Sequence, residues 1–269
     1  AFPPLWHGHA VEHAVFSPDG RLVMTASLDG VARLWELSGE TAAPALLAGD
    51  GRLANAVFDA DRRRVSTIGD DNTARVLDAA TGAAISPVLA LDSPGQCAVL
   101  SPDGSRLATG SQGAVQVWNV ATGNLISQVH HERPIRFIAW RPDGHAVLSV
   151  ADDDDAARVW NPDTGADFTP PLAHGEEITD ATFSSDGKRI ATVSNSGTGR
   201  VWDAATGQSL LPPLRHGGGL RRVRFNRDGT VLVTASMDGT VRLWNPASGA
   251  QVTPPLRHGG WVNDLAFSP

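Results

Sequence analysis

Short apolar and β-branched runs alternate with polar turns along the chain, and no stretch has the periodicity of an amphipathic helix. Residues 223–253 show the pattern. Apolar runs at 223–225, 231–235 and 240–244 are separated by turns, of which Asp238-Gly239 is a strong hairpin signal. A fourth run at 252–253 meets a Pro-Pro pair. We therefore predict four short strands per unit, with the fourth at the sheet edge because proline lacks an N–H donor.

This unit recurs at steps of 40 to 43 residues. Its first motif is aromatic-Ser-Pro-Asp-Gly, which is degraded to varying degrees and begins at Phe16, Phe58, Leu100, Trp140, Phe183, Phe225 and Phe267. An Arg-Leu/Val-Trp motif runs in phase and ends at Trp35, Leu77, Trp118, Trp160, Trp202 and Trp244. Pro-Pro-Leu-x-His-Gly begins at Pro3, Pro170, Pro212 and Pro254. Four strands in such a period are typical of propeller blades, so we predict an all-β fold with one β-propeller domain over residues 1–269.

These motifs resemble those of WD-repeat (WD40-type) β-propellers over the whole length of the chain. The resemblance implies a buried network of a His before the first strand, a Ser or Thr on the second, an Asp in the next turn and the strand-three Trp. The sets carried over are His7, Thr25, Asp29 and Trp35; His131, Ser149, Asp154 and Trp160; and His216, Thr234, Asp238 and Trp244. A fourth set keeps His174, Thr192 and Trp202 but has Ser196 where Asp is expected.

The second and third repeats depart furthest from this pattern. The second has Gly49 and Leu77 in place of His and Trp, and the third keeps Thr109 and Trp118 but lacks both His and Asp. A partly satisfied buried network costs stability. We therefore predict faster amide hydrogen exchange in blades two and three than in blades one and six, and slower exchange there would contradict this.

The number of blades depends on the two ends of the sequence. Six complete repeats are present, with a spare outer strand expected near Phe2 to Trp6 and a spare inner strand near Val262 to Phe267. In the resembled family a terminal outer strand closes the ring, so a seven-bladed plan is favoured over a six-bladed one. We expect the chain to be a piece of a longer polypeptide that can self-associate through the incomplete blade, because unpaired strand edges are sticky.

Composition and charge narrow the functional classes. The net charge of −7 argues against a dedicated nucleic-acid binder, and no apolar run is long enough to span a membrane. The single cysteine, Cys97, favours a buried structural residue and a reducing compartment. With no signal-like segment in the sequence, we expect a cytoplasmic location.

Candidate chemistry is sparse, and we expect no cofactor and no metal. His7, His9 and His13 lie close in sequence but do not have the spacing of zinc ligands. The carboxylate run Asp152 to Asp155 lacks the alternating ligands and glycine of a calcium loop, and Gly217 to Gly219 lacks the rest of a phosphate-binding motif.

We expect that the protein is not an enzyme. The alternative is a propeller hydrolase or lyase with an axial carboxylate site.

The loops of the expected top face vary between repeats and are the candidate partner-binding surface. Asp152 and Asp153 belong to the blade beside that of Glu176 and Glu177, so we expect one acidic patch that binds Arg or Lys of a partner. Leu220, Met237 and Trp261 are candidate apolar anchors. The remaining candidate contacts are basic: Arg52, Arg133 and Arg221.

The resemblance implies a non-catalytic scaffold that binds a protein or peptide, and the expected acidic patch favours a basic partner. Similar bacterial propellers are often joined to kinase or signalling-ATPase modules. We therefore expect the chain to be a sensor or docking domain of a larger regulator. A sugar-binding propeller is disfavoured because the chain has no Tyr and most of its Trp residues lie in strands.

Overall fold

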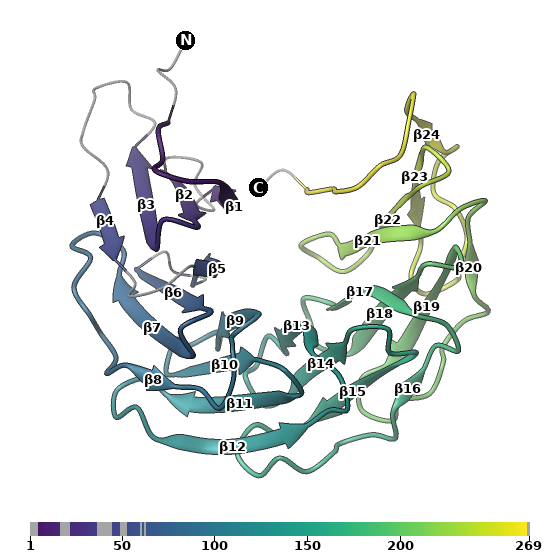
Figure 1. The fold of residues 1–269 in the computed structure, drawn as a ribbon. Coiled ribbons are helices and arrows are strands. Elements are labelled where there is room, and N and C mark those ends of the chain that lie inside the picture. Colours follow the sequence, from purple (N-terminus) through teal and green to yellow (C-terminus); the bar gives the residue numbers. More distant parts are fainter. Residues whose placement is uncertain are drawn as a thin grey trace. The chain divides into compact units, whose positions relative to one another are not determined.

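The computed structural model describes residues 5–16, 22–36, 45–48, 53–59, 61 and 63–267. Two compact units divide the chain, one over Ala1–Ile138 and the other over Ala139–Ser268, and each is described by itself. Among the described residues all regular structure is β, in six four-stranded antiparallel sheets (Figure 1). No helix within these ranges could cross a membrane.

The first unit holds three sheets whose strands follow one another in chain order. The first sheet is β1 (Val11–Phe16), β2 (Leu22–Ser27), β3 (Val31–Glu36) and β4 (Ala45–Ala48). The second is β5 (Leu53–Phe58), β6 (Arg64–Gly69), β7 (Thr73–Asp78) and β8 (Leu89–Ala90). The third is β9 (Cys97–Leu100), β10 (Arg106–Gly110), β11 (Ala114–Asn119) and β12 (Leu125–His130).

The remaining sheets have the same order. The fourth is β13 (Ile135–Trp140), where the division between the units falls, β14 (Val147–Ala151), β15 (Ala156–Trp160) and β16 (Leu172–Ala173). The fifth is β17 (Ile178–Phe183), β18 (Arg189–Ser194), β19 (Thr198–Asp203) and β20 (Leu214–Arg215). The sixth is β21 (Leu220–Phe225), β22 (Leu232–Ser236), β23 (Thr240–Trp244) and β24 (Leu256–Arg257).

Sheets within a unit stack through apolar faces, as the fifth and sixth do in the second unit. Every residue of the second strand β22 is buried, as expected for a strand covered on both faces. Val193 of β18 belongs to the same core cluster as Leu220 and Val223 of β21. The Thr179 hydroxyl of β17 donates a 2.7 Å hydrogen bond to the carbonyl of Leu220, which joins the two sheets directly.

The fourth strand of most sheets is short and lies at the edge, as the Pro-Pro pairs predict. Strands β16, β20 and β24 have two residues each and begin directly after such a pair. Before the prolines, a single bridge joins each outer segment to the strand-three Trp, as between Trp202 and Ser209. The prolines interrupt this ladder because they donate no backbone hydrogen bond.

The terminal strands expected from the repeat register are not formed in the described residues. Leu5 and Trp6 are exposed and lie outside any strand, and Phe2 to Pro4 lie outside the described ranges. Residues 262–267 form no strand, although the backbone N–H of Val262 donates to the carbonyl of Ser236 at 3.1 Å. A strand requires a hydrogen-bonded ladder, and one bond does not make one. The number of blades stays a prediction.

Candidate functional site

The indole N–H of the strand-three Trp donates to the strand-two hydroxyl in five sheets. The pairs are Trp35 with Thr25, Trp118 with Thr109, Trp160 with Ser149, Trp202 with Thr192, and Trp244 with Thr234. The donor–acceptor distances are 2.8 to 3.0 Å. Each bond satisfies an indole donor that is buried, or half-buried in the case of Trp35, and has lost hydration.

The sixth sheet has the complete network. His216 contacts the Thr234 hydroxyl through Nε2 at 2.8 Å and the Asp238 carboxylate through Nδ1 at 3.3 Å. Asp238 also accepts from the backbone N–H groups of Gly217 and Thr240, and from the Thr240 hydroxyl at 2.6 Å. Burial raises the pKa of Asp238, but the hydrogen bonds from Thr240 and Gly217 outweigh it and hold that pKa far below its usual range.

The first and fourth sheets show only parts of the expected network. His7 contacts the Arg33 guanidinium through Nδ1 at 3.2 Å, and its buried Nε2 has no hydrogen-bond partner. Asp29 accepts from the backbone N–H of Gly8 at 2.9 Å, as Asp238 does from Gly217. In the fourth sheet, Asp154 accepts from the backbone N–H of Ala156 at 3.3 Å, while His131 lies in the first unit.

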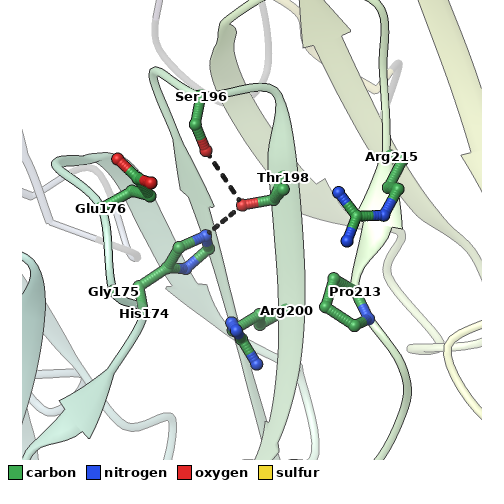
Figure 2. Close-up of a pocket in the computed structure, with 8 residues that line it drawn as sticks. All are labelled: His174, Gly175, Glu176, Ser196, Thr198, Arg200, Pro213 and Arg215. Atoms are coloured by element: carbon green, nitrogen blue, oxygen red, sulfur yellow. Dashed lines mark hydrogen bonds between the residues drawn. The ribbon is translucent and has the colours of Figure 1, made fainter.

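In the fifth sheet the buried histidine contacts two hydroxyls and no carboxylate. His174 is buried and contacts the Thr192 hydroxyl through Nδ1 and the Thr198 hydroxyl through Nε2, both at 2.8 Å. Ser196, in the position of Asp238, lies 2.8 Å from the Ser194 hydroxyl and 3.3 Å from that of Thr198 (Figure 2). Burial, helped by the nearby charge of Arg200, lowers the pKa of His174 to about 4, so the ring is neutral at pH 7.

A pocket of about 360 Å³ opens at this altered position (Figure 2). Its lining residues come from the loop before β17, the β18–β19 turn, and strands β19 and β20: His174, Gly175, Glu176, Ser196, Thr198, Arg200, Pro213 and Arg215. The charged members are two arginines and one glutamate. The pocket therefore carries a net positive charge on a chain whose total is −7.

Arg200 and its counterparts are the strand-three arginines of the Arg-Leu/Val-Trp motif. Arg33 pairs with Asp29 at 2.8 Å, and Arg158 pairs with Asp167 at 2.9 Å. Arg242 lies 3.9 Å from Asp238. Arg200, like Arg242, has a buried Nε with no hydrogen-bond partner, and its guanidinium carbon lies 5.8 Å from the centre of the Trp202 ring. Its guanidinium thus lacks the carboxylate that these three counterparts have.

The structure brings the two predicted acidic loops together. The backbone N–H of Ile178 donates to the Asp154 carbonyl at 2.9 Å, and that of Gly175 donates to the Asp155 carbonyl at 3.3 Å. Asp152, Asp153 and Glu176 are exposed, and Glu177 is half-buried. We call these four side chains the acidic loop pair. Glu176 belongs to both the acidic loop pair and the pocket.

The other candidate contacts are scattered. Trp261 is 65% exposed, whereas Met237 and Arg221 are half-buried. Arg133 is exposed in the first unit, and Arg52 lies outside the described residues. Leu220 is not a surface anchor, because it is fully buried as the first residue of β21 and packs in the core between the fifth and sixth sheets.

Sequence reasoning missed a buried carboxylate. Asp180 of β17 accepts from the backbone N–H of Val223 at 2.9 Å and from the Arg224 guanidinium at 2.5 Å. Burial raises the pKa of Asp180, although the Arg224 charge opposes that shift. A carboxylate with a raised pKa is a candidate acid, but both contacts occupy one oxygen of Asp180 and join β17 to β21. The geometry is that of a structural tie between sheets.

No group of three or more His, Cys, Asp or Glu side chains in the described parts of the chain is placed to hold a metal ion. His7 is half-buried against Trp35, and His9 is exposed. Cys97, the single cysteine of the sequence, is buried in β9.

Comparisons with known proteins agree with this architecture. The model of the WD domain, G-beta repeat, matches residues 3–36, 86–119, 123–161, 169–203 and 209–245. These segments cover well over half of the chain. The chain therefore belongs to the WD-repeat family, and its four-stranded sheets are the blades of a β-propeller fold. WD-repeat proteins typically act as scaffolds for protein interactions.

Individual relatives match only part of the chain. Human WD repeat and SOCS box-containing protein 1 is 32% identical over 93 residues, which are 34% of this chain and 22% of the relative. Mouse ribosome biogenesis protein BOP1 is 28% identical over 134 residues, covering 36% of this chain and 18% of the relative. The chain thus spans less than a quarter of either protein. Both of these relatives are animal proteins, so they do not test the prediction that the repeats are of a bacterial type.

The solved structures include a close match in fold. The crystal structure of the computationally designed Ika8 protein superposes with a TM-score of 0.82 and 24% sequence identity. The match covers 98% of this chain and 79% of the designed one. At this identity the likeness concerns the fold alone.

Proposed function

We propose that the chain is a non-catalytic docking module that binds a partner protein or peptide through the acidic loop pair. The observation that carries the proposal is the pair of backbone hydrogen bonds between the 152–155 turn and the 174–178 loop, which joins the two loops that carry the four carboxylates. Such a surface attracts Arg or Lys side chains of a partner and orients it on approach. The chain would serve as one part of a larger regulatory protein.

The family and the relatives support this proposal at a coarser level. The family consists largely of interaction scaffolds, and the raised pKa of Asp180 results from its burial at a structural contact between sheets. A propeller enzyme would need carboxylates that face an open site. Asp78, Asp203 and Asp228 have lowered pKa values because hydrogen bonds within their own turns stabilise their carboxylates.

The charge reversal Glu176→Arg with Glu177→Arg should weaken binding of a basic probe. The intact chain is titrated at low salt into an arginine-rich peptide, Gly-Arg-Gly-Arg-Gly-amide with a fluorescent dye on its N-terminus, and binding is followed by the fluorescence anisotropy of the dye. We expect the affinity to fall by about tenfold, because exposed charge pairs contribute modestly and are screened by salt. The wild-type affinity should itself fall as salt is added.

Asp163→Lys is the matched control. Asp163 is exposed in the turn after β15, at the opposite end of that strand from Asp152 and Asp153. Equal losses in the control and in the double reversal would show that only net charge matters. Such a result would remove the acidic loop pair as the docking surface.

A further inference from the structure

We propose that the pocket beside Ser196 is an oxyanion-binding site that takes a phosphate-type group or a carboxylate. It occupies the position where sister blades hold an Asp side chain. The ligand would supply the negative charge that the chain itself leaves out. The site deepens the docking function proposed above, since the oxyanion can be carried on a partner chain.

The sixth sheet shows what the fold does with a carboxylate at this position. Asp238 there accepts hydrogen bonds from Gly217 and from the backbone and hydroxyl of Thr240, and it lies 3.9 Å from Arg242. The corresponding residues of the fifth sheet are Gly175, Thr198 and Arg200. The Gly175 N–H donates to the Asp155 carbonyl and the Thr198 hydroxyl contacts His174, so Arg200 is the one of these three groups left without its acidic partner where Ser196 replaces the Asp.

The unused donors of the fifth sheet line an open space. Arg200 has no carboxylate partner and keeps a buried Nε without a hydrogen bond. Arg215, which pairs with Thr198 across β19 and β20, points its guanidinium toward Thr198 (Figure 2). Two guanidinium groups that line one pocket together with a hydroxyl suit a planar or tetrahedral oxyanion, to which arginine donates paired hydrogen bonds.

Shape and charge favour the same ligand class. The pocket volume of about 360 Å³ exceeds the space that a single Asp side chain would fill, so a phosphate-type group can enter. The His174 ring contributes no charge at pH 7 because burial lowers its pKa to about 4. Glu176 is exposed at the rim and opposes an anion, while its neighbours in the acidic loop pair would attract basic residues that flank the anion on a partner.

Titration with inorganic phosphate tests the site without any partner. The intact chain is titrated at constant ionic strength with chloride as the reference anion, and the Nε–Hε signals of arginine are followed by NMR. We expect saturable shifts of the Arg200 and Arg215 signals. Arg215→Gln should weaken the affinity by about tenfold, because one of two guanidinium donors is lost.

Matched variants separate the site from general surface charge. Ser196→Asp should abolish binding, because its carboxylate would occupy the donors as Asp238 does in the sixth sheet. Glu176→Gln should tighten binding by about two- to threefold by removing the opposing charge. Arg257→Gln removes the sister of Arg215, which pairs with Thr240 in a blade that has its own Asp, and should leave the affinity unchanged.

The source of the oxyanion is settled by a second titration. Acetyl-Gly-phosphoserine-Gly-amide is compared with free phosphate and with the unphosphorylated peptide. Tighter binding of the phosphopeptide than of the free ion supports a ligand carried on a partner, and equal binding supports a free ion as ligand. Absence of saturable shifts with either probe, or binding that survives both Ser196→Asp and Arg215→Gln, would overturn the site. Neither of these outcomes bears on the basic-peptide titration that tests the docking function.

Discussion

Replacing Trp160 with alanine is expected to lower the free energy of unfolding by about 3 to 5 kcal/mol, the range for deleting a fully buried Trp. Trp160 has no solvent-exposed surface and ranks first by volume among the fully buried side chains within the described residues. Its indole donates to Ser149 at 3.0 Å, and its backbone bridges Asp167 of the outer segment. One substitution therefore removes both packing and a hydrogen bond. Urea denaturation followed by circular dichroism measures the change.

Trp160→Phe separates the two contributions. Phenylalanine keeps much of the ring volume but leaves the Ser149 hydroxyl without the indole donor, so we expect a loss of about 1 to 3 kcal/mol. Trp261→Ala is the matched control, because Trp261 is 65% exposed and its removal should change stability by less than about 0.5 kcal/mol. If Trp160→Ala had no larger effect than Trp261→Ala, the buried indole would not be a principal source of stability in this blade.

The repeat period allowed much of the fold to be predicted from sequence. A strand exposes alternate residues to opposite faces, so the in-phase Trp and Thr positions had to meet across the second and third strands, and five such pairs are formed. The Pro-Pro pairs likewise predicted the edge strands, because proline donates no backbone hydrogen bond. These features depend on residues close in sequence or on a fixed register between neighbouring strands.

Features that depend on packing between sheets were not predictable in this way. Leu220 lies next to a glycine-rich loop and was expected at the surface, yet strand β21 begins there and turns it into the core. Asp180 is one carboxylate among many in the sequence, and only the approach of β21 buries it against Arg224. A repeat pattern fixes which strands pair, but it does not state which side chain a neighbouring sheet covers.

The pocket at Ser196 could be predicted from the sequence only in part. The missing Asp could be recognised from the sequence, and Arg200 belongs to a motif that was itself identified. The sequence did not show that Arg215 of the next strand faces the same space. A repeat that loses one member of a charged pair and keeps the other is the signal that could have indicated the site.

Acidification from pH 7 to pH 4 is expected to destabilise the second unit strongly through His174 and His216. Burial, together with the charges of Arg200 and Arg242 respectively, lowers the pKa of each ring to about 4, from an ordinary value of 6.5 in the unfolded chain. For His216 the Asp238 carboxylate opposes this shift, but burial outweighs it. Both rings are therefore neutral in the fold and become charged readily only when the chain unfolds.

The direction of the pH dependence follows from proton uptake. Between pH 6.5 and about 4 the unfolded chain binds protons at these two positions that the folded chain does not, so the stabilising contribution is complete above pH 6.5 and is lost as the pH falls toward 4. Each histidine should account for about 2 to 3 kcal/mol over this interval. Together they approach the whole stability of a typical domain.

Urea denaturation at a series of pH values between 7 and 4 measures the slope. His174→Gln and His216→Gln should each flatten the slope, whatever offset they add from the hydrogen bonds they lose with Thr192 and Thr234. His145→Gln is the control, because His145 is exposed in a turn and its replacement should leave the slope as it is in the unaltered chain. An unchanged slope in both buried variants would mean that the two rings are already charged in the fold. That would contradict the closed, desolvated networks around them and leave acid lability to carboxylates with lowered pKa values such as Asp238, which stays ionised until the pH falls well below 4.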